Sequence, residues 1–175
     1  VRYDKINRTA LLEFNGINAG EYKISILPSL ESSAGLKMES GYKAQFTAVS
    51  DFSDSVEFKF DNPRSNRLNQ TVSYDVTITN TSTADLKLPL MLVLDPAQYF
   101  NGEVQGAIGQ NRDGAFLVDL QNSLENGTLK AGESITNRTI TVFNPDAYRV
   151  ELAPGIYTLP YPNNPPEIIS NPVVT

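Results

Sequence analysis

Apolar and polar residues alternate along most of the chain with a period of two. Because successive side chains of a β-strand face opposite sides of the sheet, this period predicts strands. The clearest case is 71–79, where Val72, Tyr74, Val76 and Ile78 alternate with polar residues. The same alternation predicts further strands over 10–14, 21–26, 42–46, 56–60, 116–120, 140–142 and 148–152.

The segment 86–94 is apolar at almost every position, which predicts a strand covered on both faces. Pro89 cannot donate a backbone hydrogen bond, so it indicates an edge position or a bulge. If the strand is an edge, Lys87 and Pro89 would protect it from pairing with another chain. A helical stripe is suggested only over 29–38, and Gly35 interrupts it.

Turn signals separate these short strands. Asn15-Gly16, Asn101-Gly102, Asp113-Gly114 and Asn126-Gly127 each join a residue that tolerates positive φ to a glycine. Short strands at close spacing predict an all-β fold with little or no helix, built as an antiparallel β-sandwich. The alternating aromatic and branched residues would then fill the space between two sheets.

One short pattern occurs three times: an apolar residue, two spacers, a glycine, one spacer, and then Tyr or Ser entering a strand. Gly20 with Tyr22 forms the first copy, and Gly155 with Tyr157 forms another. In the third copy Ser134 takes the place of the tyrosine. We expect the glycines to form sharp corners and the tyrosine hydroxyls to bond to upstream backbone, which is a structural role.

The composition excludes several kinds of chemistry. The 175 residues include 14 basic and 20 acidic side chains, for a net charge of −6, and no Cys, His or Trp. Without Cys and His there is no usual zinc site, no haem or iron–sulfur ligation, and no Ser–His–Asp or Cys–His pair. The net acidity argues against nucleic acid as a partner. The longest apolar run, 90–94, is far too short to insert in a membrane, and the N-terminal residues lack a signal-peptide pattern.

Acidic and amide side chains suggest two calcium sites, because calcium prefers clustered oxygen ligands. The first lies in the Gly-rich loop 95–114 and the strand after it, although no EF-hand spacing is present. Its candidate ligands are Asp95, Asn101, Glu103, Asp113 and Asp119. Ordinary solvated turns explain the same residues. The second would use Asp51, Asp54 and Asp61 at a junction between modules.

Tyr99 and Phe100 are the candidate ligand-binding residues. They are adjacent, so in an extended stretch one of them should face outward, and with Tyr161 they could form a sugar-stacking platform. Local packing is the alternative. Five Asn-x-Ser/Thr triplets would be surface acceptors of N-glycans in a eukaryotic secretory protein. They begin at Asn7, Asn69, Asn80, Asn126 and Asn137.

Two segments resemble bacterial surface modules. Residues 10–48 resemble the closing half of an S-layer-type Ig-like domain, although Ser33 and Leu36 replace the family's usual Asp and Asn. Residues 52–161 resemble one complete bacterial Ig-like or fibronectin-like repeat, with the Asn80-Thr81-Ser82 phrase after a strand. The tail, with Pro165-Pro166 before Ile168, resembles the start of a cadherin-like module.

These resemblances imply three parts: a partial Ig-like module over 1–50, a complete Ig-like β-sandwich over 51–162, and a Pro-rich linker with the start of a next module over 163–175. Alternatively, 1–50 adds strands to one enlarged sandwich. The resemblances also imply a function: a non-catalytic spacer or adhesion module of a large secreted or cell-surface bacterial protein. Its expected partners are neighbouring domains of the same polypeptide and a surface protein or glycan. The alternatives are a glycan- or protein-binding β-sandwich and an accessory domain of an extracellular hydrolase. No cofactor is expected apart from the possible calcium.

Overall fold

The computed structural model describes residues 2–4, 6–7, 9–12, 17–32, 34–95, 101–147 and 149–159. The chain divides into two compact units, Val1–Val49 and Ser50–Thr175. The all-β prediction is confirmed, because every strand pairing is antiparallel. The described residues contain no α-helix and only two 3-10 turns, η1 (Ser53–Ser55) and η2 (Gln121–Ser123). The predicted linker 163–175 lies outside the described residues.

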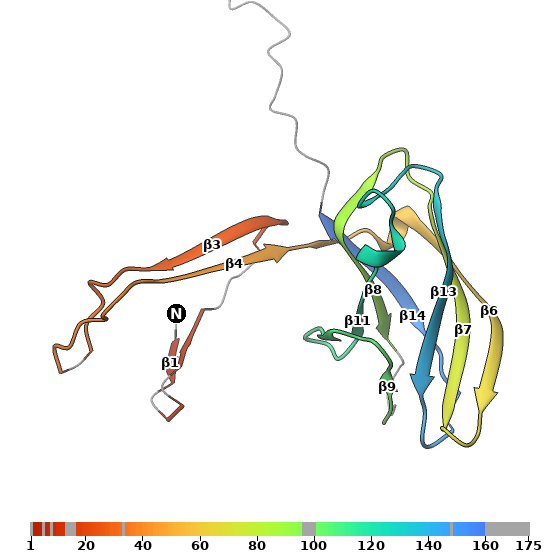
Figure 1. The fold of residues 1–175 in the computed structure, drawn as a ribbon, viewed down its shortest axis with the longest axis horizontal. Coiled ribbons are helices and arrows are strands. Elements are labelled where there is room, and N and C mark those ends of the chain that lie inside the picture. The colour runs from red at the N-terminus through yellow and green to blue at the C-terminus, as the bar shows by residue number, and fades with distance from the viewer. Residues whose placement is uncertain are drawn as a thin grey trace, which may run out of the picture. The chain divides into compact units, whose positions relative to one another are not determined.

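The first unit consists of two separate two-stranded sheets (Figure 1). One pairs β1 (Arg2–Asp4) with β2 (Thr9–Leu11), and the other pairs β3 (Gly20–Ile26) with β4 (Tyr42–Ala48). Instead of a helix, 29–38 forms turns and one bridge between Glu31 and Lys37. No side chain described in this unit is fully buried.

The second unit contains two larger sheets (Figure 1). The first has the strand order β10 (Gly109–Gln110), β11 (Phe116–Asp119), β8 (Leu86–Asp95), β14 (Ala153–Leu159) and β5 (Ser50–Asp51), with β12 (Thr128–Leu129) also paired to β8. The second has the order β6 (Val56–Asn66), β7 (Thr71–Asn80), β13 (Ser134–Phe143) and β9 (Glu103–Val104).

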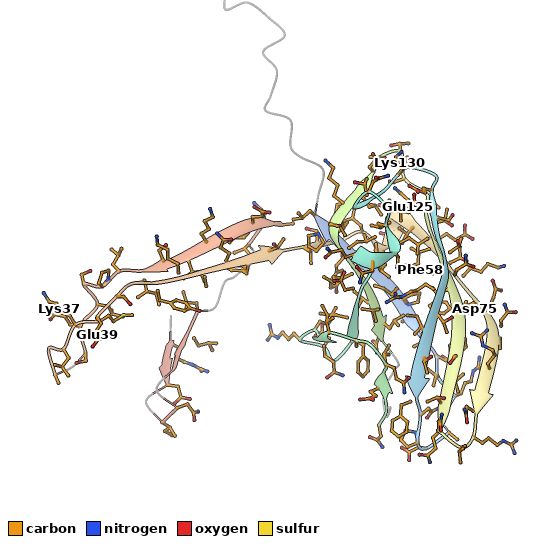
Figure 2. All side chains as sticks on the ribbon, viewed as in Figure 1. Lys37, Glu39, Phe58, Asp75, Glu125 and Lys130 are labelled. Carbon is orange, nitrogen blue, oxygen red and sulfur yellow. The ribbon has the colours of Figure 1, made fainter. Side chains whose placement is uncertain are left out.

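A single hydrophobic core draws side chains from both of these sheets, an arrangement consistent with a β-sandwich. The period-two pattern produces it directly: Val76 and Ile78 of β7 are buried, and Thr77 between them is not. Phe58 of β6, labelled in Figure 2, packs against this core. The fully buried members include Leu86, Leu90, Leu92, Leu94, Val118, Leu129, Ile140, Val142 and Ile156.

The prediction of an edge position for Pro89 is wrong, because β8 lies between β11 and β14. The alternative, a bulge, is what the register shows: Tyr157 faces Met91, whereas Leu159 faces Lys87. Two extra residues of β8 are accommodated there, so the missing N–H of the proline interrupts no regular ladder. Lys87 and Pro89 therefore protect no sheet edge.

The strand predicted over 148–152 is also wrong where the structure describes it. Val150 and Leu152 pack against the core from irregular backbone, and β14 begins only at Ala153. An alternation of apolar and polar residues can therefore arise in a loop that directs two side chains to the core, as well as in a strand.

The first and last described strands of the second unit are neighbours. Ser50 of β5 is opposite Thr158 of β14, so the first and last described strands of this unit meet at one end, called here the proximal end. At the opposite end, the distal end, Thr71 is opposite both Asn66 and Phe143. Figure 1 shows the β6–β7 turn far from the end of β14. Because β7 has 10 residues, the two ends are about 30 Å apart.

Candidate functional site

A depression at the distal end has a volume of about 580 Å³. Two segments form it: the β6–β7 hairpin around its turn, and the irregular chain that follows β13. Apolar parts come from Pro63, Val72, Tyr74, Ala147 and Val150, and polar parts from Ser65, Asn66, Arg67, Gln70, Thr71, Asn144 and Arg149.

Local hydrogen bonds hold both segments in place. The side-chain oxygen of Asn66 accepts from the backbone N–H groups of Leu68 and Asn69 at 3.1 and 3.2 Å, which shapes the turn. The backbone N–H of Asn144 donates to the carbonyl of Gln70 at 2.8 Å and joins the two segments. Asn144 is itself buried. The depression is therefore part of a fixed framework.

The charge of the depression is opposite to that of the chain. Arg67 and Arg149 line it, and none of the acidic residues that the structure describes does. Arg149 forms an ion pair with Glu151 at 3.2 Å, and both side chains are more than two-thirds exposed. Such exposed pairs contribute little, about 0–1 kcal/mol. The site thus combines two guanidinium groups that a ligand can reach with side-chain amides and apolar side chains.

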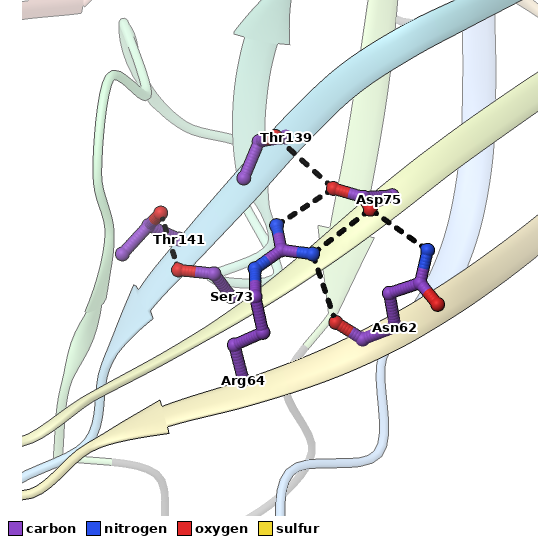
Figure 3. Close-up of polar contacts among 6 residues, drawn as sticks. All are labelled: Asn62, Arg64, Ser73, Asp75, Thr139 and Thr141. Carbon is purple, nitrogen blue, oxygen red and sulfur yellow. Dashed lines mark hydrogen bonds and ion pairs between the residues drawn. The ribbon is translucent and has the colours of Figure 1, made fainter.

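A second depression, of about 400 Å³, lies over Asp75 and the two β-bulges beside it. Arg64 donates to both carboxylate oxygens of Asp75 at 2.7 and 2.8 Å (Figure 3). Asn62 and Thr139 donate to the same carboxylate at 3.0 and 3.2 Å. These three donors, Arg64 foremost, hold the pKa of Asp75 far below its usual range, and the hydrogen bond to Asp75 raises the pKa of Arg64. Because these four hydrogen bonds occupy it, Asp75 acts as a clamp that joins three strands.

The predicted ligands of the first calcium site lie on different elements. Asp95 ends β8, Glu103 lies on β9 of the other sheet, and Asp119 ends β11. Asp113 lies in the turn after β10, and Asn101 donates to Asp146 at 3.0 Å. Asp119 accepts from the backbone of Gln121 at 2.8 Å, a local turn contact. Among the described residues no three acidic side chains form a group that could hold a metal ion.

The second predicted calcium site consists of locally bonded acids. Asp51 accepts from the backbone and the hydroxyl of Ser53, and Asp61 forms an ion pair with Lys59 at 2.9 Å. Asp54 lies in η1. These three acids also form no metal-holding group among the described residues. Both calcium sites therefore stay predictions. Tyr99, Phe100 and Tyr161 lie outside the described residues.

Of the predicted glycine–tyrosine corners, the one at Tyr22 makes the expected hydrogen bond and the one at Gly155 does not form. The Tyr22 hydroxyl donates to the carbonyl of Asn18 at 2.6 Å, so the expected bond to upstream backbone is present, just after Gly20. Gly155 instead lies inside β14, opposite Val93, and Tyr157 is opposite Met91. A Cβ on Gly155 would lie 2.8 Å from the Ser53 hydroxyl oxygen, so this glycine permits close packing of η1 and forms no corner.

Asn80 has a role that the sequence pattern did not identify. It is completely buried, and its side-chain amide donates to the carbonyls of Ala84 and Leu129 at 2.8 and 3.0 Å. Its side-chain oxygen accepts from the backbone and the hydroxyl of Ser82. The prediction of a surface acceptor at Asn80 is therefore wrong. Asn7, Asn69, Asn126 and Asn137 are exposed.

Arg67 and Arg149 were not among the predicted site residues. The available signal was local: Arg64 and Arg67 lie close together beside a turn in an acidic chain. That signal could not associate them with Arg149, because only the fold brings the two segments together.

Comparisons with protein-family models, with curated proteins and with solved structures give no match to this chain. In the part of the chain that the structure describes, no helix has the length and apolar character to cross a membrane.

Proposed function

We propose that the second unit is a non-catalytic adhesion module of a secreted or cell-surface multidomain protein, which binds its partner at the distal end. The single observation that carries this proposal is the pairing of β5 with β14. Because β5 and β14 meet at the proximal end, the distal end lies about 30 Å from both of these strand ends, and we infer that a partner binds there.

The same pairing argues against a simple in-line spacer. A spacer lengthens a chain when its two ends lie at opposite ends of the module. Here Ser50 and Thr158 are directly opposite each other, so the described chain of the module begins and ends at the same end and adds little length. The resemblance of 52–161 to bacterial Ig-like repeats also supports a surface role, with neighbouring domains of the same polypeptide as further partners.

The side chains of the second unit support a binding role over a catalytic one. Asp75 and Asn80 are both held by several hydrogen bonds within the fold. Neither is available to transfer a proton or attack a substrate. The distal depression offers guanidinium and amide groups, which bind and orient ligands.

Oriented immobilisation of the full chain tests the proposal. The sequence has no cysteine, so one introduced cysteine fixes the attachment point. Lys130→Cys attaches beads at the proximal end, which Figure 2 shows near the top of the unit, and leaves the distal end free. Leu68→Cys, at a position 91% exposed, attaches them at the distal turn and blocks it.

The beads are applied to a panel of immobilised polysaccharides and extracellular-matrix proteins. We expect Lys130-attached beads to adhere and Leu68-attached beads to lose adhesion to the same surface. Equal adhesion in both orientations would place the binding surface elsewhere. If neither bead adheres, the module is structural and the proposal fails.

A further inference from the structure

We propose that the distal depression binds a saccharide that carries a carboxylate. This inference rests on the proposed function and names the ligand class for the same end of the module. Its basis is the contrast between a chain of net charge −6 and a depression whose described lining contains two arginines and no acid. A local positive field favours anionic ligands over neutral ones.

The two guanidinium groups are available to a ligand. Arg67 is exposed and forms no ion pair with any described residue. Arg149 exchanges its exposed partner Glu151 for a ligand at little cost. Arg64, by contrast, is committed to Asp75 and does not line the depression. A planar guanidinium matches a carboxylate with two parallel hydrogen bonds, so Arg67 and Arg149 favour a carboxylate over a diffuse anion.

The rest of the lining suits a sugar ring. Val72, Tyr74 and Val150 offer apolar surface to the C–H groups of a ring. The side-chain amide of Gln70 can donate and accept, and the side-chain NH2 of Asn66 can donate, as sugar hydroxyls require. The volume of about 580 Å³ lies within the range of ligand-binding clefts, about 300–1,000 Å³.

Tyr74 is oriented before any ligand arrives. Its ring meets Phe60 edge to face, with centroids 6.2 Å apart and planes at 85°. Its hydroxyl makes no hydrogen bond to another described residue, although the side chain is half-buried. A fixed ring with an unused hydroxyl provides both a contact surface and a polar contact to a sugar.

The backbone around the depression is held in a costly conformation. Gln70 and Ala147 both have positive φ, 53° in each case, and both line it. Hydrogen bonds between Asn144 and these two residues keep them there. Such strain in non-glycine residues occurs preferentially at ligand sites, where rigidity reduces the entropy lost on binding.

An acidic peptide is the competing ligand. Peptides that bind β-proteins usually add a strand along a free sheet edge. The depression instead lies across strand ends, at the β6–β7 turn, and β6 is interrupted by a bulge between Asp61 and Arg64. The geometry therefore favours a compact ring-shaped ligand, and the experiment includes a peptide to decide between them.

The test measures binding to the full chain by titration calorimetry at low salt. The probes are a trimer of galacturonic acid, the matched neutral trimer of galactose, and a short polyglutamate peptide. We expect binding of the acidic trimer alone, weakened by added salt. Arg67→Gln and Arg149→Gln should each weaken it roughly tenfold, the loss expected for a charged hydrogen-bonding partner. Arg112→Gln is the matched control, because Arg112 is exposed, lies outside the depression and should leave binding unchanged.

Three results would overturn the inference: no binding of the acidic trimer, equal binding of the neutral trimer, or an equal loss in the Arg112 variant. Tighter binding of polyglutamate would replace the saccharide by a peptide. Failure here is separable from failure of the proposed function. Oriented beads that still adhere through the distal end would retain the adhesion module and remove only this ligand class.

Discussion

Replacement of Asn80 by alanine should destabilise the second unit strongly. Asn80 is 0% exposed and makes four side-chain hydrogen bonds, two as donor and two as acceptor. It connects the end of β7 to the carbonyl of Leu129 in β12, which belongs to the other sheet. The substitution removes every one of these bonds and leaves buried polar groups behind.

The magnitude follows from the count. Each hydrogen bond contributes about 1 kcal/mol net, and a buried carbonyl left without a donor costs about 1–3 kcal/mol. The Ala84 carbonyl keeps the hydroxyl of Ser82 as a donor, so the loss there is partial. We expect Asn80→Ala to lower the free energy of unfolding by about 3 kcal/mol, a large part of the ~5–15 kcal/mol typical of a domain.

Urea unfolding followed by circular dichroism measures this loss. With a slope of about 2 kcal/mol per molar urea, the midpoint should fall by about 1.5 M. Asn69→Ala is the matched control, since Asn69 also begins an Asn-x-Ser/Thr triplet but is exposed. It should change stability by less than about 0.5 kcal/mol. Equal midpoints for the two variants would refute the role assigned to Asn80.

Two further substitutions test the packing and electrostatics of the second unit. The pKa of Asp75 is lowered from 3.8, so its ion pair stabilises the fold above that pH, and the stability is lost as the pH falls below it. Asp75→Asn should flatten the decline of Tm between neutral pH and about pH 2, and an unchanged acid slope would contradict this. Gly155→Ala should cost about 1–3 kcal/mol in urea unfolding, because the new Cβ meets the Ser53 oxygen at 2.8 Å. Gly109→Ala, with open space around it, should cost far less; equal losses would show that the contact to Ser53 does not matter.

Local periodicity predicted most of the strands but not how they pair. The alternation over 71–79 corresponds to β7 because one face of that strand is buried and the other is not. Pro89 illustrates the limit: its missing N–H was correctly associated with an irregularity, but the bulge forms in a central strand. The 148–152 segment shows the same limit, since packing against the core also produces alternation outside a strand.

The distal depression could not be predicted because its parts are brought together only by the fold. Arg67 follows β6 in a turn, whereas Arg149 belongs to the irregular chain between β13 and β14. Their association depends on the register that places Phe143 opposite Thr71. The acidic clusters seen in the sequence show the reverse: residues close along the chain were separated onto β8, β9 and β11.

The first unit provides a final prediction, because its stability must differ from that of the second. Of the ten large apolar side chains that the structure describes as exposed, eight belong to it, including Leu27 at 67% and Leu36 at 72%. An isolated two-stranded hairpin is marginally stable in water. The stacked rings of Tyr22 and Phe46, 5.3 Å apart, contribute only about 1 kcal/mol beyond their burial. In hydrogen-exchange mass spectrometry of the full chain, β3 and β4 amides should therefore exchange close to the unprotected rate, whereas β7 and β8 amides should remain protected by the free energy of the core. Equal protection of both pairs would mean that another surface covers the apolar side chains of the first unit.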